Sequence, residues 1–69
     1  MTRNEARKIM SSPPTILCTD LFRDRDALLE IQHYKPAGYL PASVRCRRHT
    51  IWGAGDWQHV SASKLEPKP

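Results

Sequence analysis

The chain has 69 residues, of which 39% are hydrophobic and 26% are charged, and eleven Lys and Arg against seven Asp and Glu give a formal net charge of +4. This length excludes a second core, and a domain of this size buries only about 60% of the surface of its unfolded chain. A homodimer, a bound partner or a metal would therefore supply stability that the small core lacks.

Neither a membrane segment nor a disulfide scaffold is expected. The first ten residues are polar, unlike a secretory leader, and no stretch approaches the roughly 18 apolar residues of a membrane span. Two cysteines, Cys18 and Cys46, are too few for a disulfide framework, and we expect each to act as a small buried hydrophobe. These features favour a cytoplasmic protein with reduced thiols and no membrane partner.

The chain is expected to begin with a short helix or arm over residues 1–14. Residues 2–10 have helix-forming composition, with Thr2 or Asn4 as N-cap. The two prolines within residues 11–14 then end the helix, because proline lacks an amide donor and pushes the preceding residue toward extended geometry.

Residues 15–22 predict the first strand, and residues 23–26 a charged turn that Asp24 closes. Strict alternation divides the strand into two faces, one carrying Ile16, Cys18 and Phe22 and the other Leu17 and Leu21.

Residues 27–34 fit two structures. A helix is favoured by composition, with Asp24 or Asp26 as N-cap, whereas alternation and the short length before the next loop favour a strand. We favour the strand. The proline- and glycine-containing segment 35–43 is a loop whose Tyr39 and Leu40 should fold back on the core, or else form a contact point for a partner.

Two β-compatible runs, residues 44–52 and 57–62, flank the glycine-rich residues 53–56 and predict a hairpin that turns there. This register places Trp52 opposite Trp57, a pair suited to core or hairpin packing. The single domain is expected over 15–63, followed by a disordered tail over 64–69, which contains two prolines and two lysines.

The expected fold is therefore of the α+β class, with a short N-terminal helix and a small curled antiparallel sheet of three to four strands. The alternative is a mainly β protein that resembles SH3-like or OB-like small barrels in architecture only, since no motif of either group occurs.

The first run of the predicted hairpin indicates a cationic surface. If residues 44–52 alternate as a strand, Arg45, Arg47 and His49 share one face with Ile51, opposite a face with Val44, Cys46, Thr50 and Trp52. Arg48 falls on the apolar face, unless a bulge turns it outward or its stem snorkels at the sheet edge. Arg forks bind phosphate bidentately, and Tyr side chains stack on unpaired bases. The candidate site, for nucleic acid or another partner, is Arg45, Arg47, Arg48, His49, Tyr34 and Tyr39.

A metal site is the weaker use of the same region. Cys46 and His49 form a C-x2-H pair, and Cys18, His33 and His59 are further donors. However, a strand directs residues i and i+3 to opposite faces, and the paired spacing of zinc modules is lacking. We predict no metal and no cofactor.

No enzyme is expected. The sequence contains no phosphate-binding loop, dinucleotide fingerprint, zinc-protease or nucleophile-elbow motif. A dyad of Cys46 with His33 or His59 would lack an oxyanion donor and a third member, and the short chain leaves little room for a substrate pocket.

The sequence therefore predicts a small basic protein that binds without catalysing, first nucleic acid, either DNA or RNA, through the Arg-rich strand. The alternative is a small accessory or inhibitor protein of the phage or mobile-element type that docks on a larger protein, with Arg and Tyr as interface anchors.

Overall fold

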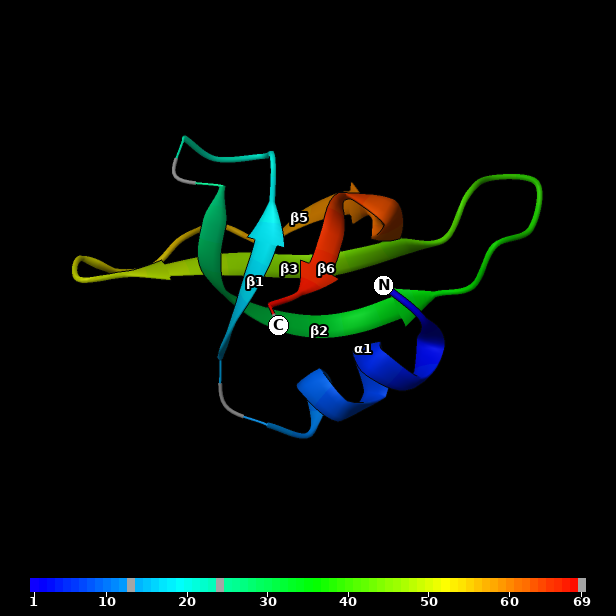
Figure 1. Ribbon diagram of the computed structural model, residues 1–69, viewed down its shortest axis with the longest axis horizontal. Helices are drawn as coiled ribbons and strands as arrows, with labels where there is room; N and C mark the ends of the chain where they lie inside the picture. The colour runs from blue at the N-terminus through cyan, green and yellow to red at the C-terminus, as the bar shows by residue number, and fades with distance from the viewer. Residues whose placement is uncertain (13, 24, 69) are drawn as a thin grey trace.

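The computed structural model describes residues 1–12, 14–23 and 25–68 and contains one α-helix, one 3-10 helix and six strands (Figure 1). In chain order these are α1 (Arg3–Met10), β1 (Thr15–Thr19), β2 (Asp26–Lys35), β3 (Ser43–Thr50), β4 (Gly53–Ala54), β5 (Gln58–Ser61), the 3-10 helix η1 (Ala62–Lys64) and β6 (Leu65–Pro67). The strand order is β4-β3-β2-β1-β6, with β5 also paired to β3, and every pairing is antiparallel. The molecule is mostly β, so the mainly β alternative describes it at least as well as the α+β expectation.

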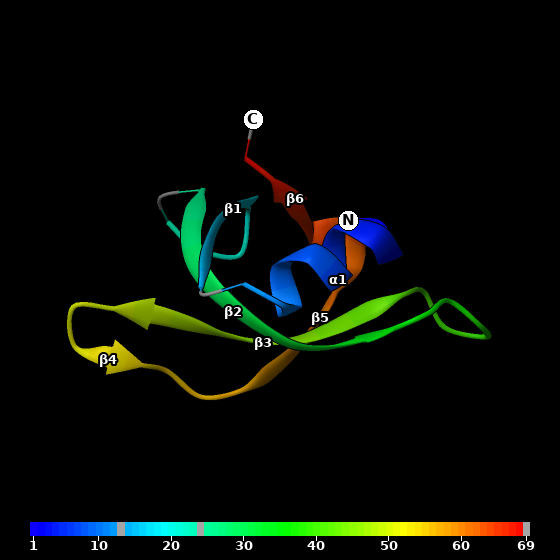
Figure 2. The ribbon, with the colours of Figure 1, turned by 90° about the horizontal axis from the view of Figure 1, so that it is seen from below.

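The N-terminal helix forms as expected, and its start is fixed by a capping box. The Thr2 hydroxyl accepts a hydrogen bond from the amide of Glu5 at 3.2 Å, and the Glu5 carboxylate accepts one from the amide of Thr2 at 2.8 Å. Ala6 and Ile9 are the buried residues of α1, which packs against β2 (Figure 2). No helix in the described part of the chain has the length and apolar character needed to cross a membrane.

Residues 27–34 are strand, which settles the ambiguity between helix and strand. The first part of β2 pairs with β1, and the part from Leu29 to Lys35 pairs with β3. The ladder shifts register between Ile31 and His33, a bulge that increases the local twist. Figure 2 shows the resulting curve of β2 around the helix side of the molecule.

The core lies inside the curled sheet, beneath α1. Its fully buried side chains include Leu17, Leu29, Val44 and Leu65, which come from four different strands. The whole buried cluster is Ile9, Leu17, Ala27, Leu29, Ile31, Val44, Cys46, Ala62 and Leu65.

The first strand ends earlier than expected, at Thr19. Its inward face carries Leu17 and Thr19, whereas Ile16 on the other face is 49% exposed. The expected closing role of Asp24 in the following turn lies outside the described residues. In the described part of that turn, Arg25 has a φ of 60° and its carbonyl accepts a hydrogen bond from the Thr19 amide at 2.8 Å.

The expected disordered tail over 64–69 does not hold for Leu65–Pro67. These residues form β6, which pairs antiparallel with β1, and Leu65 is fully buried. A buried leucine in the final strand closes the core against β1, so the ordered domain extends beyond residue 63.

The hairpin forms, but its turn lies two residues earlier than expected. Thr50 pairs with Gly53, so Ile51 and Trp52 are the loop, while Gly53 takes the positive φ of 113° that favours glycine. Trp52 is therefore 91% exposed rather than packed against Trp57.

The loop between β2 and β3 likewise does not fold back on the core. Tyr39 and Leu40 are 109% and 71% exposed, which contradicts the expectation that they pack inward. This loop and the β3–β4 turn project from opposite ends of the long axis of the molecule (Figure 1).

Candidate nucleic-acid interface

Strand β3 presents three basic side chains on its outer face, as its alternation predicted. Val44 and Cys46 point into the core and are fully buried. Arg45, Arg47 and His49, which alternate with them, are half-buried on the other side of the sheet.

Two histidines on the neighbouring strands extend this set sideways. The register places His33 of β2 and His59 of β5 opposite Arg45, and residues opposite each other in a ladder share a face. A row of His33, Arg45 and His59 therefore crosses three strands. The sequence alone does not place either histidine beside Arg45, because their alignment depends on the strand register.

The loop between β4 and β5 adds an aromatic ring to this surface. The guanidinium carbon of Arg47 lies 4.5 Å from the centre of the Trp57 ring, and that of Arg45 lies 5.5 Å from it. Both distances are within the range of cation–π attraction. The ring orients the two guanidinium groups on one side of the sheet. We call this set, His33, Arg45, Arg47, His49, Trp57 and His59, the basic face.

One carboxylate of β2 partly neutralises the basic face. Glu30 lies opposite Arg47 in the ladder, and its Oε1 accepts a hydrogen bond from Arg47 Nε at 2.8 Å. The same oxygen lies 2.8 Å from His49 Nε2. The hydrogen bond with His49, followed by that with Arg47, holds the pKa of Glu30 below its ordinary value. Glu30 thus stays ionised and offsets charge at this end of the face.

Arg45 differs from Arg47 in this respect. Among the residues that the structure describes, Arg45 has no carboxylate partner, and its contact is with the Trp57 ring. Its guanidinium is therefore the strongest candidate for an external anion.

The other three site residues predicted from the sequence do not lie on the basic face. Arg48 points to the opposite side of β3, where its guanidinium carbon lies 4.5 Å from the centre of the Phe22 ring. Arg48 therefore stays on the side of the sheet that strict alternation predicts, and the register shift of this ladder lies in β2, between Ile31 and His33. Tyr34 is opposite Val44 and packs against the core, and Tyr39 lies at the tip of the β2–β3 loop.

The cysteines and histidines do not converge. Cys46 points into the core while His49 points outward, and no group of three or more His, Cys, Asp or Glu in the described ranges is placed to hold a metal. Burial raises the pKa of the Cys46 thiol. Burial, followed by a hydrogen bond with Asp26, raises the pKa of the Cys18 thiol. Both cysteines are thus thiols of low nucleophilicity at neutral pH.

Comparison of the chain with protein-family models, with curated proteins and with solved structures found no match. Function is therefore inferred from the geometry and charge of the basic face.

Proposed function

We propose that this protein is a small non-catalytic binding protein whose ligand is nucleic acid, and that Arg45 and Arg47 of β3 contact its phosphates. The observation that carries the proposal is the pair of guanidinium groups stacked on one Trp57 ring on the outer face of β3. Two Arg forks held side by side suit successive phosphates, because each fork donates in a fixed plane.

The surroundings of the pair support a polyanion rather than a single carboxylate. His33 and His59 flank Arg45 on both sides, so hydrogen-bonding groups continue across the sheet. The chain has a formal net charge of +4, which favours association with a polyanion through counterion release. The Glu30 carboxylate offsets positive charge only at the end of the basic face that carries Arg47 and His49.

We further propose that the fold is an SH3-like small barrel. The strand order β6-β1-β2-β3-β5, with the 3-10 helix η1 before the last strand, supports this reading. Such barrels carry many unrelated functions, so the basic face and not the barrel indicates the ligand. Two free cysteines with raised pKa values fit a reducing cytoplasmic location.

A salt titration tests the proposal. Binding of a fluorescent 12-nucleotide oligonucleotide should give log K falling linearly with log[salt], with a slope of about −0.9 to −0.7 for each phosphate contacted. Arg45→Ala should weaken binding and reduce the magnitude of this slope by about that amount, with the melting temperature unchanged.

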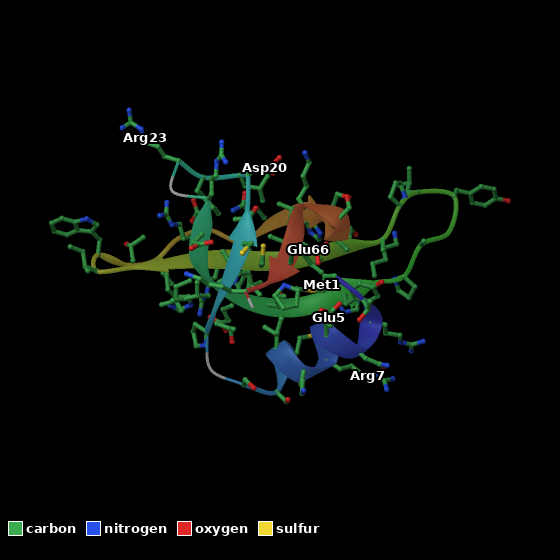
Figure 3. All side chains as sticks on the ribbon, in the orientation of Figure 1. Met1, Glu5, Arg7, Asp20, Arg23 and Glu66 are labelled. Atoms are coloured by element: carbon green, nitrogen blue, oxygen red, sulfur yellow. The ribbon has the colours of Figure 1, made fainter. Side chains whose placement is uncertain are left out.

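The matched control is Arg7→Ala, which removes the same formal charge from the outer side of α1 (Figure 3). It should change the slope much less than Arg45→Ala. If the two variants behave alike, the effect is one of net charge, and the basic face is not the site. Absence of binding to any oligonucleotide or to heparin at about 50 mM salt, where phosphate contacts are strong, would end the proposal.

A protein partner is the second candidate, and the two exposed loops favour it. Tyr39 with Leu40, and Ile51 with Trp52, are apolar pairs with no cover in the described part of the molecule. Neighbouring apolar side chains that are exposed together can contribute to an interaction surface. A partner retained from nuclease-treated lysate by the wild type, and lost with Leu40→Ala or Ile51→Ala but retained by Arg45→Ala, would support this function.

A further inference from the structure

We infer that the nucleic acid bound by this protein is single-stranded, lying along β3 with one base stacked on Trp52 and another on Tyr39. This inference rests on the proposed function and adds the class of nucleic acid and the residues that recognise its bases. Its starting observation is that both aromatic side chains are almost completely exposed, at 91% for Trp52 and 109% for Tyr39.

Tyr39 and Trp52 lie in the two loops that flank one strand, β3. β3 begins just after the loop that carries Tyr39 and ends just before the turn that carries Trp52. Figure 1 shows these loops, drawn in green and in yellow, at opposite ends of the long axis, with β3 running between them. The basic face thus lies between two aromatic platforms.

Single strands suit this arrangement better than duplexes. Proteins that bind single strands without sequence preference combine a positive track for the backbone with aromatic side chains on which bases stack. A duplex keeps its bases stacked on one another, so isolated aromatic tips gain little from it. The apolar pairs alone would also suit a protein partner, but two guanidinium groups on one ring between them suit a phosphate backbone.

The length of the molecule sets the size of the site. Its long axis is 36 Å, and a stacked strand advances about 3.4 Å for each nucleotide, so about ten nucleotides reach from tip to tip. This falls within the range of about 4 to 16 nucleotides that single OB folds occupy. Affinity should therefore rise with length up to about ten nucleotides and then level off.

The experiment compares three ligands: a 12-nucleotide oligo-dT, a 12-residue strand of the same charge that lacks all bases, and a 12-base-pair duplex. Fluorescence anisotropy with the full chain gives each Kd at the same low salt. We expect the oligo-dT to bind at least tenfold more tightly than the abasic strand, because base–aromatic stacking contributes on this scale.

Variants then locate the stacking. Trp52→Ala should weaken oligo-dT binding by about tenfold, equivalent to about 1.4 kcal/mol, and leave the abasic strand unaffected. Trp52→Phe should restore most of the affinity. Ile51→Ala is the matched control, because Ile51 is 92% exposed in the same turn but has no ring; it should change Kd less than twofold. In a Trp57→Phe variant, Trp52 is the single tryptophan, and oligo-dT should quench its fluorescence.

The outcomes separate this inference from the proposed function. If the oligo-dT and abasic strands bind equally and Arg45→Ala weakens both, the protein binds phosphates as proposed and the stacking inference is wrong. If Trp52→Ala and Ile51→Ala weaken oligo-dT binding equally, the tip is an apolar contact and not a base platform, which also overturns the inference. If no strand binds while Trp52→Ala abolishes binding of a purified protein partner, both proposals fail.

Discussion

Replacing Glu30 by glutamine should increase the affinity for nucleic acid. Glu30 is the carboxylate that the structure places beside Arg47 and His49 on the basic face, at 2.8 Å from each. Glutamine keeps the shape and one oxygen that accepts the hydrogen bond from Arg47 Nε, so the guanidinium should keep its orientation. The negative charge disappears, and Arg47 no longer shares its guanidinium with a carboxylate that competes with phosphate.

The size of the effect follows from the geometry. A phosphate bound on the outer side of Arg47 would lie roughly 7 Å from the Glu30 carboxylate, and removing this repulsion should tighten Kd about threefold in a water-like dielectric. A lower effective dielectric at the half-buried site would increase the factor toward about tenfold or more, and added salt would reduce it. We therefore expect a three- to tenfold gain at low salt.

Fluorescence anisotropy with a 12-nucleotide strand measures this directly. Glu66→Gln is the matched control, since it removes one carboxylate from β6, where Glu66 pairs with the amino group of Met1 at 3.4 Å (Figure 3). The control should change Kd less than twofold. Equal gains from both variants would show that only net charge matters. Weaker binding by a well-folded Glu30→Gln protein would show that Glu30 organises the site rather than opposing the ligand.

Three further predictions concern stability. The pKa of Glu30 is held below its ordinary value of 4.5, so the stability that its ion pairs contribute is present above pH 4.5 and is lost as the pH falls through the lowered value. The difference in unfolding free energy between wild type and Glu30→Gln, measured in urea, should therefore shrink over that acidic range. A difference that stays constant with pH would refute the linkage. Leu65→Ala should lower the free energy of unfolding by about 2 to 5 kcal/mol, because it opens a cavity at a fully buried position of β6. The control is Leu40→Ala, at an exposed position. If the two variants are equally stable, β6 does not close the core. Thr2→Ala should lower the free energy of unfolding by about 1 kcal/mol, because the capping box is lost. Asn4→Ala, on the exposed side of α1, should lower it little. Equal melting temperatures of the two variants would mean that the helix start contributes nothing to folding.

Local signals predicted the parts of the fold that local chemistry decides. The capping residue, the helix-forming composition and the prolines that follow all lie within about a dozen residues, and α1 forms between them. The alternation of β3 likewise placed Val44 and Cys46 inside and Arg45 and Arg47 outside. In both cases one element contains its own periodicity, so no knowledge of its neighbours is needed.

The turn of the hairpin was misplaced because glycine content alone does not set register. The pairing of Val44 with Val60 in the core, together with irregular residues 55–57, moves the turn to Ile51 and Trp52. A shift of two residues leaves each side chain of β3 on its own face but removes Trp52 from its expected partner. Residue types indicate that a tight turn is present, whereas its exact position depends on the register, which burial elsewhere in the sheet decides.

The error in the tail has a related cause. Residues 64–69 are rich in Pro and Lys, a composition that favours disorder, but a single buried side chain, that of Leu65, decides the structure of β6. In a chain with so small a core, one leucine is a substantial fraction of the stability, which for 69 residues is roughly 3 to 10 kcal/mol. The one apolar residue in the polar tail was the signal that would have indicated a docked strand.

The candidate site shows the same division between local pattern and tertiary contact. The stripe of Arg45, Arg47 and His49 follows from alternation, but the residues that tune it come from other strands. Glu30 offsets one arginine and Trp57 orients two, and neither partnership is visible without the register of β2 and the path of the chain after β4. The proposed function therefore separates binding from folding along the stripe. Arg45, which has no carboxylate partner among the described residues, is available to a ligand without loss to the fold, whereas an anion that engages Arg47 competes with Glu30 for the same guanidinium.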